Sequence, residues 1–118
     1  MTGMLEGKVI LVTGGIPSAA AYNSAKHGVV GLTKTVALAY ARVNIRVKAV
    51  CPGCIETPML DRVTDASVKI RAQLIGTVPL RPVAQPHEID DAVAWLMSDK
   101  SSYVTGVALP VDGGWVAQ

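Results

Sequence analysis

The sequence predicts an α/β fold in which a small parallel sheet of about three strands is flanked by helices. Lys8–Thr13 is a short apolar run with the composition of a buried strand, and Ile45–Cys51 alternates in part between apolar and polar residues, as a strand does. Each ends in a turn that contains glycine. Between them lies a proline-free stretch, Ala20–Ala41, whose apolar residues recur at helical spacing. A strand, a crossover helix and a parallel strand form a right-handed unit, so we expect these strands to belong to one sheet.

The second half of the chain is expected to add helices and a last strand. Met59–Ile75 has the mixed composition of a helix pair, and Gly76–Gln85 is interpreted as a connector because it contains two prolines. Pro86 and the acidic residues after it fit the first turn of a helix, where carboxylates complement the helix dipole. Thr105–Val111 is predicted to be the last strand, followed by a turn at Asp112–Gly114.

The composition describes one small globular domain over residues 1–118. Half of the residues are apolar and 17% are charged, which is typical of a folded chain. The net charge is +2 without a cluster of Lys and Arg, so nucleic acid is not an expected partner. No stretch approaches the ~20 apolar residues that span a bilayer, and Val9–Val12 is too short for a signal-peptide core. We therefore expect a cytoplasmic protein that does not contact membranes.

The long helix is expected to be buried on more than one side. Its apolar stripe consists of Val29, Leu32, Val36 and Tyr40, and it is widened by Val30, Ala37 and Ala41. Gly28 and Gly31 each cost about 1 kcal/mol relative to alanine in a helix interior, which we interpret as close packing of another backbone. So small a sheet also lacks the helices that normally cover both faces, so we expect a homo-oligomer.

A tyrosine and a lysine near the start of this helix carry the candidate chemistry. Tyr22 and Lys26 are four residues apart, which places them on one helix face, one turn from each other. An ammonium beside a phenol favours the phenolate and lowers the pKa of such a phenol, as a general acid or base near neutral pH requires. Taken alone, this spacing also fits an ordinary amphipathic helix.

Cys51 and Cys54 have the spacing of a redox or metal-binding pair. They lie at a strand end that enters a Pro-Gly turn rather than a helix, and the sequence has no second cysteine pair. His27 and His87 are distant in sequence. We therefore interpret both cysteines as reduced structural thiols and expect no metal site.

Four segments together resemble the short-chain dehydrogenase/reductase family. They are Gly7–Gly15, Tyr22–Lys26, Asn44–Pro58 and Tyr103–Gly114, in the family's order. The resemblance implies a truncated Rossmann-like parallel sheet, an NAD or NADP cofactor, and hydride transfer between the nicotinamide and a small alcohol or ketone. It also implies that Tyr22 is the general acid/base, while Lys26 activates it and binds the nicotinamide ribose.

The resemblance implies a cofactor site at the carboxyl ends of the strands, where ligands of open α/β sheets bind. The implied cofactor-binding residues are Gly14, Tyr22, Lys26, Pro52, Gly53, Ile55 and Thr57. Gly14 belongs to the phosphate-binding loop, and the residues after Pro52 and Gly53 are those that touch the nicotinamide in the family. The phosphate loop is only partial here, because residues 16–19 replace its later glycines and Pro17 lacks an N–H.

A large part of the family's pattern is absent between Gly15 and the tyrosine helix. The missing parts are the rest of the glycine motif, three strands with their helices, an asparagine motif and the catalytic serine. If the places of the missing strands stayed empty, two rows of backbone groups in the sheet would have no hydrogen-bond partners. Either the first strand therefore shifts next to Ile45–Cys51, or a second chain fills the gap. We predict that Lys8–Thr13 pairs directly with Ile45–Cys51.

Two functions from different classes are compatible with this pattern. The first is an NAD(P)-dependent oxidoreductase, weakly active because the serine and most of the phosphate loop are missing. The alternative is a non-catalytic remnant of the family that associates with copies of itself or with a full-length relative. A sequence that represents part of a longer protein is a third interpretation. Titration with NAD(P)H separates the first two, since only an oxidoreductase requires saturable binding of the cofactor.

Overall fold

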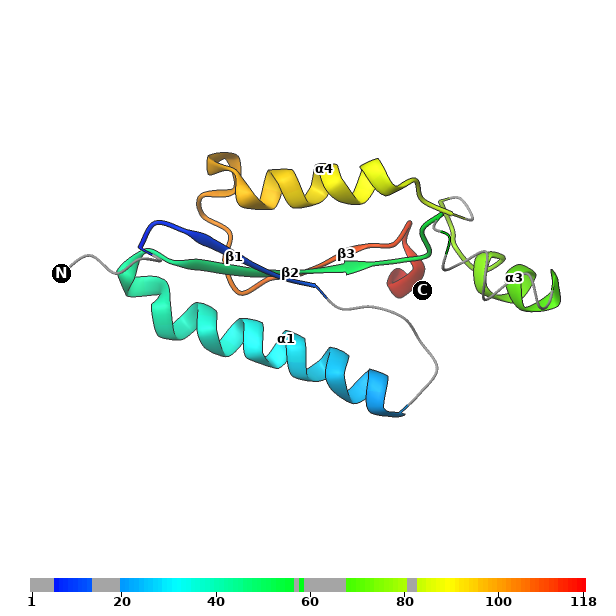
Figure 1. Ribbon diagram of the computed structural model, residues 1–118, viewed down its shortest axis with the longest axis horizontal. Helices are drawn as coiled ribbons and strands as arrows, with labels where there is room; N and C mark the ends of the chain where they lie inside the picture. Colours follow the sequence, from blue (N-terminus) through cyan, green and yellow to red (C-terminus); the bar gives the residue numbers. More distant parts are fainter. Residues whose placement is uncertain (1–5, 14–19, 57, 59–67, 81–82) are drawn as a thin grey trace. The chain divides into compact units, whose positions relative to one another are not determined.

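The computed structural model describes residues 6–13, 20–56, 58, 68–80 and 83–118, and it confirms the α/β class (Figure 1). The strands are β1 (Val9–Thr13), β2 (Arg46–Pro52) and β3 (Ala108–Val111); the α-helices are α1 (Ala20–Tyr40), α3 (Val68–Ile75) and α4 (Pro86–Met97); and the short 3₁₀ turns are η1 (Ala41–Val43), η2 (Asp99–Ser101) and η3 (Trp115–Ala117). β1, α1 and β2 agree with the predicted segments to within one residue at each end. Among the described residues, no helix is both long and apolar enough to cross a membrane.

The three strands form one sheet in the order β1-β2-β3. β1 pairs with β2 in parallel along its whole length. The hydrogen bonds between β2 and β3 advance together along both strands: Ala49 N–H donates to Val107 O (2.8 Å) and Gly53 N–H to Val111 O (2.9 Å). This is a parallel register. The predicted direct pairing of the first two strands, and a parallel sheet of three strands, are therefore confirmed.

β3 is shorter at its start than the predicted strand, which begins at Thr105. The Thr105 hydroxyl accepts a hydrogen bond from Val47 N–H (3.1 Å), so a side chain takes the place of a backbone partner there. Gly106 then has φ of 70°, a left-handed conformation that breaks an extended strand. Gly106 N–H still donates to Val47 O (2.7 Å), and the regular strand begins two residues later, at Ala108.

Contacts divide the chain into two compact units. The first unit contains residues 1–51 and 93–109, and the second contains residues 52–92 and 110–118.

In the first unit, α1 packs against β2 through small side chains. Thr33 and Ala37 are each 1% exposed, and Ala37 belongs to one apolar cluster with Ile45 and Val47. The buried Thr33 hydroxyl donates to Val29 O (2.7 Å), so its polar group is satisfied within the helix. Two small residues on one helix face allow the helix to lie close to the sheet.

The outward face of α1 carries apolar residues that the sequence pattern assigned to the core. Leu32 is 57% exposed and Tyr40 is 48% exposed, so the predicted stripe is wrong at these two positions. The buried positions are Thr33 and Ala37, of which Ala37 belongs to the predicted face, and Val36 packs partly against the same cluster. A Cβ added at Gly28 or Gly31 would meet no described atom within 4 Å. The expected close packing of another backbone is therefore not found within the described part of the chain.

The other face of β2 carries a buried lysine. Lys48 is fully buried, and its ammonium donates to Leu96 O, to Ser101 O (3.2 Å) and to Ser101 Oγ (2.6 Å). Since neighbouring residues of a strand point to opposite faces, β2 is covered by α1 on one side and by the last turn of α4 on the other (Figure 1). Arg46 donates to the same Ser101 O (2.5 Å). Burial, followed by the charge of Arg46, lowers the pKa of Lys48 to about 8.

Candidate functional site

In the first unit, the start of α1 places the tyrosine and lysine of the candidate site. α1 begins at Ala20, so Tyr22 lies in its first turn and Lys26 follows one turn later on the same face. Lys26 is half-buried, and Tyr22 is described by its backbone alone. The helix therefore brings these two residues to one face, as their spacing predicts. Gly14 lies outside the described residues.

In the second unit, the turn that follows β2 contains three more of the predicted cofactor-binding residues. Pro52, Gly53 and Ile55 are described and are each half-buried, whereas Thr57 lies outside the described residues. This turn, Pro52–Glu56, continues from the carboxyl end of the central strand. In open α/β sheets, ligands bind beyond the carboxyl ends of the strands.

One side of this turn is held by the end of β3. Gly53 N–H donates to Val111 O (2.9 Å). A Cβ added at Gly53 would lie 2.6 Å from the Cα of Asp112 and 2.8 Å from its Cβ. These distances are far below van der Waals contact, so only glycine fits where the turn approaches Asp112.

The other side of the turn is held by the segment that leads into α4. Ala84 N–H donates to Cys54 O and Glu56 N–H donates to Ala84 O, both at 2.9 Å, and Ile55 forms an isolated parallel bridge with Ala84. The Pro52–Glu56 turn is thus fixed by backbone hydrogen bonds on both sides.

Two carboxylates stabilise the segments that hold the turn. Asp112 accepts hydrogen bonds from Gly114 N–H (3.0 Å) and Val116 N–H (3.2 Å), one on each oxygen. Glu88 accepts from Gln85 N–H (2.8 Å) at the start of α4, as in a capping box. Both side chains serve backbone groups that have no partner within a strand or helix.

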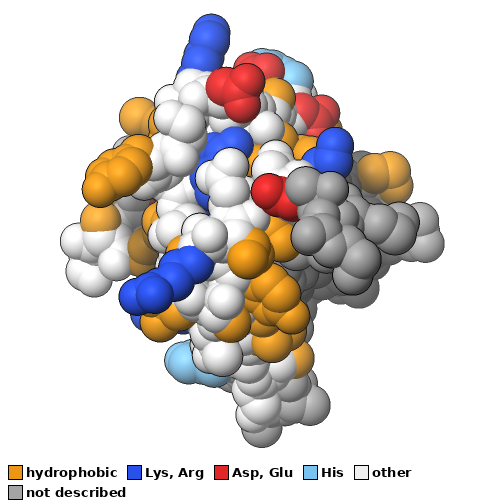
Figure 2. All heavy atoms as spheres, turned by 90° about the vertical axis from the view of Figure 1, so that its left-hand side faces the viewer, with side chains coloured by type: hydrophobic (Ala, Val, Ile, Leu, Met, Phe, Trp, Pro, Cys, Tyr) orange, Lys and Arg blue, Asp and Glu red, His pale blue; other side chains and the backbone are white. Residues whose placement is uncertain are grey.

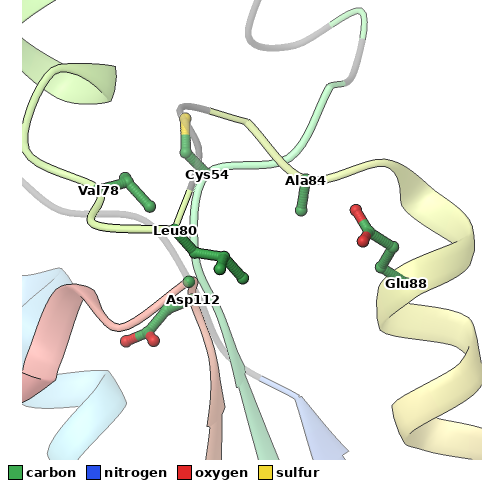
Figure 3. A pocket seen from close by; sticks show the side chains of 7 residues that line it. Cys54, Val78, Leu80, Ala84, Glu88 and Asp112 are labelled. Atoms are coloured by element: carbon green, nitrogen blue, oxygen red, sulfur yellow. The ribbon is translucent and has the colours of Figure 1, made fainter.

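A cavity of about 70 Å³ lies beside the turn in the second unit (Figure 3). It is lined by Cys54, Val78, Leu80, Ala84, Glu88, Asp112 and Gly113. In Figure 3 the side chains of Leu80 and Glu88 point toward each other. Pockets for drug-sized ligands measure about 300–1,000 Å³, so this cavity is too small for a dinucleotide and has room only for a small chemical group.

Cys51 and Cys54 of the C-x-x-C sequence do not form a disulfide. Cys51 belongs to β2, and Cys54 lines the cavity. Among the described residues, no group of three His, Cys, Asp or Glu side chains is arranged to hold a metal ion.

The residues that hold the turn are only weakly marked in the sequence. A weak signal exists for Asp112, since Asp followed by two glycines after a strand is typical of a turn in which the carboxylate binds backbone N–H groups. Glu88 fits the capping-box spacing relative to Gln85. The pairing of Ala84 with the turn leaves no pattern in the sequence, because Ala84 lies outside any helix or strand run.

The parallel sheet, its crossover helix and the glycine turn at the end of the central strand define a truncated Rossmann-like fold. Residues 5–116 match the family model described as "Enoyl-(Acyl carrier protein) reductase". The chain belongs to the short-chain dehydrogenase/reductase family of oxidoreductases.

The proteins that this chain resembles are about twice as long. The chain is 43% identical to 2,5-dichloro-2,5-cyclohexadiene-1,4-diol dehydrogenase of Sphingobium indicum, over 87% of this chain and 41% of that protein. Among solved structures, a short chain dehydrogenase family protein from Francisella tularensis is 34% identical with a TM-score of 0.83, over 96% of this chain and 52% of the other. ElxO, solved with NADP bound, is 28% identical with a TM-score of 0.81, over 93% of this chain and 47% of the other. The chain therefore spans about half the length of the relatives it matches.

Proposed function

We propose that this chain is an NAD(P)-dependent oxidoreductase that transfers a hydride between the nicotinamide and a small alcohol or ketone. The observation that carries the proposal is the pair Tyr22 and Lys26, one turn apart at the start of α1 in a chain of this family. Relatives support the reaction class, since one is a diol dehydrogenase and another was solved with NADP. We further propose that both units act together as one truncated NAD(P)-binding domain over residues 1–118.

In this proposal each residue has a distinct role. The Tyr22 hydroxyl gives its proton to the carbonyl oxygen during reduction and takes a proton from the alcohol during oxidation. The Lys26 ammonium favours the phenolate of Tyr22 and also binds the nicotinamide ribose. The cofactor, when bound, supplies the hydride.

The turn that follows β2 supports the proposed contact with the nicotinamide end of the cofactor. Gly53 brings its backbone close to Asp112 and leaves no side chain over the turn. Pro52, Gly53, Ile55 and Thr57 form the proposed nicotinamide contact, and Gly14 a partial phosphate contact. Because a matching serine and most of the phosphate loop are missing from the sequence, we propose weak binding and weak turnover.

The exposed face of α1 supports a homo-oligomer and also the alternative function. Leu38 is 80% exposed and Leu32 is 57% exposed, with open space above Gly28 and Gly31 in the described part of the chain. Hydrophobic side chains also lie open to solvent among charged ones in the view of Figure 2. If cofactor binding is absent, a non-catalytic remnant that associates through this helix becomes the better description.

The test is turnover with NAD(P)H and a panel of small ketones and alcohols. Tyr22→Phe keeps the ring and removes the proton, so activity is expected to fall by about 10²–10⁴-fold with stability nearly unchanged. Lys26→Met is expected to impair both turnover and cofactor binding. Tyr40→Phe is the matched control, since Tyr40 lies on the same helix and is exposed. Robust wild-type activity that persists in Tyr22→Phe would remove Tyr22 from the site.

A further inference from the structure

The Pro52–Glu56 turn rests directly on one residue of the neighbouring strand end. Gly53 approaches Asp112 so closely that an added Cβ would lie 2.6 Å from the Asp112 Cα. The hydrogen bond from Gly53 N–H to Val111 O, one residue earlier, fixes the same approach. The position of the turn therefore depends on where the backbone at Asp112 lies.

Asp112 in turn is fixed by its own side chain. Its two carboxylate oxygens accept from Gly114 N–H (3.0 Å) and Val116 N–H (3.2 Å), and its carbonyl accepts from Trp115 N–H (3.3 Å). Gly113 and Gly114 have φ of 64° and 91°, which lets the chain wrap around the carboxylate. Hydrogen bonds to a charged acceptor are among the stronger ones in proteins.

A second contact secures this wrapped segment. Leu80 N–H donates to Gly113 O (3.0 Å), and Trp115 Nε1–H donates to Thr77 Oγ1 (3.1 Å). The segment that follows Asp112 is therefore held by residues 77–80 as well as by the Asp112 carboxylate.

We propose that Asp112 is a positioning residue for the Pro52–Glu56 turn. By binding two backbone N–H groups of the segment after β3, its carboxylate fixes the surface on which Gly53 rests. As a result, Ile55 and the other residues of the turn are held in one fixed position. An effect of Asp112 on nicotinamide binding rests on the proposed function, whereas its effect on the position of the turn does not.

Amide hydrogen exchange tests the positioning role without a cofactor. In Asp112→Ala the Gly53 amide is expected to exchange about tenfold faster or more, because a charged acceptor of two hydrogen bonds is lost. The Glu56 amide, held by Ala84, and the Ala49 amide, held by Val107, are expected to change much less. Equal acceleration at all three amides, or no change at Gly53, would overturn the proposal.

Two further variants keep this test decisive. Asp112→Asn has the same shape and retains one acceptor oxygen, so it is expected to give a smaller acceleration at Gly53 and serves where Asp112→Ala fails to fold. Asp91→Asn removes the same charge from an exposed position of α4 and is expected to leave the Gly53 amide unchanged.

Binding measurements connect the turn to the cofactor. Asp112→Asn is expected to weaken NAD(P)H binding about tenfold, which is about 1.4 kcal/mol, and to leave ADP-ribose binding unchanged because ADP-ribose lacks the nicotinamide. Equal weakening of both ligands would contradict a role at the nicotinamide end. A wild-type chain that binds neither ligand would refute the proposed function, while the Gly53 amide would still decide the role of Asp112.

Discussion

Raising the pH from about 7.5 to about 10.5 is expected to remove the destabilisation that the buried Lys48 causes, because Lys48 is more easily deprotonated in the folded chain than in the unfolded chain. Within the described part of the chain, the Lys48 ammonium donates only to carbonyl and hydroxyl oxygens, on Leu96 and Ser101. Arg46 shares the Ser101 carbonyl and adds a second positive charge. The ammonium is therefore buried beside a like charge.

The magnitude follows from the pKa of Lys48. Burial and the Arg46 charge lower this pKa from 10.5 to about 8. A difference of about 2.5 units corresponds to about 3 kcal/mol, since each unit is worth about 1.4 kcal/mol.

The sign follows from proton binding in the two states. Below about pH 8 both states hold the Lys48 proton, and the full penalty of the buried charge is present. Between about pH 8 and pH 10.5 the unfolded chain binds more protons than the folded chain, so the free energy of unfolding rises with pH.

The assay is urea denaturation at a series of pH values, with a reductant present to protect the cysteines. The comparison is between wild type and Lys48→Met, because subtracting the two curves cancels every other titrating group. Between about pH 7.5 and pH 10.5, the free energy of unfolding of wild type is expected to rise by about 3 kcal/mol relative to that of Lys48→Met. Lys100→Met, which removes an exposed lysine, is expected to give a flat difference. Parallel curves for wild type and Lys48→Met would refute the reasoning.

Two other outcomes are expected. Leu38→Glu places a charge on the exposed face of α1 and is expected to abolish self-association measured by light scattering, whereas Leu80→Glu, at a position that is also exposed, is expected to leave it intact; a wild-type chain that is monomeric at micromolar concentration would contradict this. Replacing both Cys51 and Cys54 by serine is expected to preserve the fold and any turnover, and a folded but inactive double variant would show that the thiols are functional.

Backbone pairing was the most predictable part of the fold. The pairing of β1 with β2 follows from a requirement that leaves few options, since buried backbone groups need partners and a gap between the two strands would leave two rows of these groups unpaired. The end of α1 was also readable from sequence, because Asn44 adopts the left-handed conformation (φ 62°) that is common after a helix.

Side-chain burial was less predictable, for reasons that particular residues show. Periodicity placed Leu32, Ala37 and Tyr40 on one apolar face, and of these Ala37 is buried. Thr33 is buried beside it because small side chains permit close packing. The burial of Lys48 depends on carbonyl groups at the end of α4, about fifty residues away in sequence. Such contacts are set by the tertiary structure and leave no local pattern.

In the candidate site, too, local features were predictable from the sequence and tertiary contacts were not. The spacing of Tyr22 and Lys26 predicts that they share a helix face, because helical geometry is local. The support of the Pro52–Glu56 turn by Asp112 and Ala84 joins segments that are distant in sequence.

The direct pairing of β1 with β2 places β1 at the edge of the sheet. In the described part of the chain β1 pairs with β2 alone. Its sequence, Val-Ile-Leu-Val-Thr, contains no charge and no proline, the devices by which natural edge strands discourage pairing with other chains. The direct pairing of β1 with β2 thus leaves an aggregation-prone edge strand. Precipitation, rather than unfolding, is expected to set the highest concentration at which this protein stays in solution.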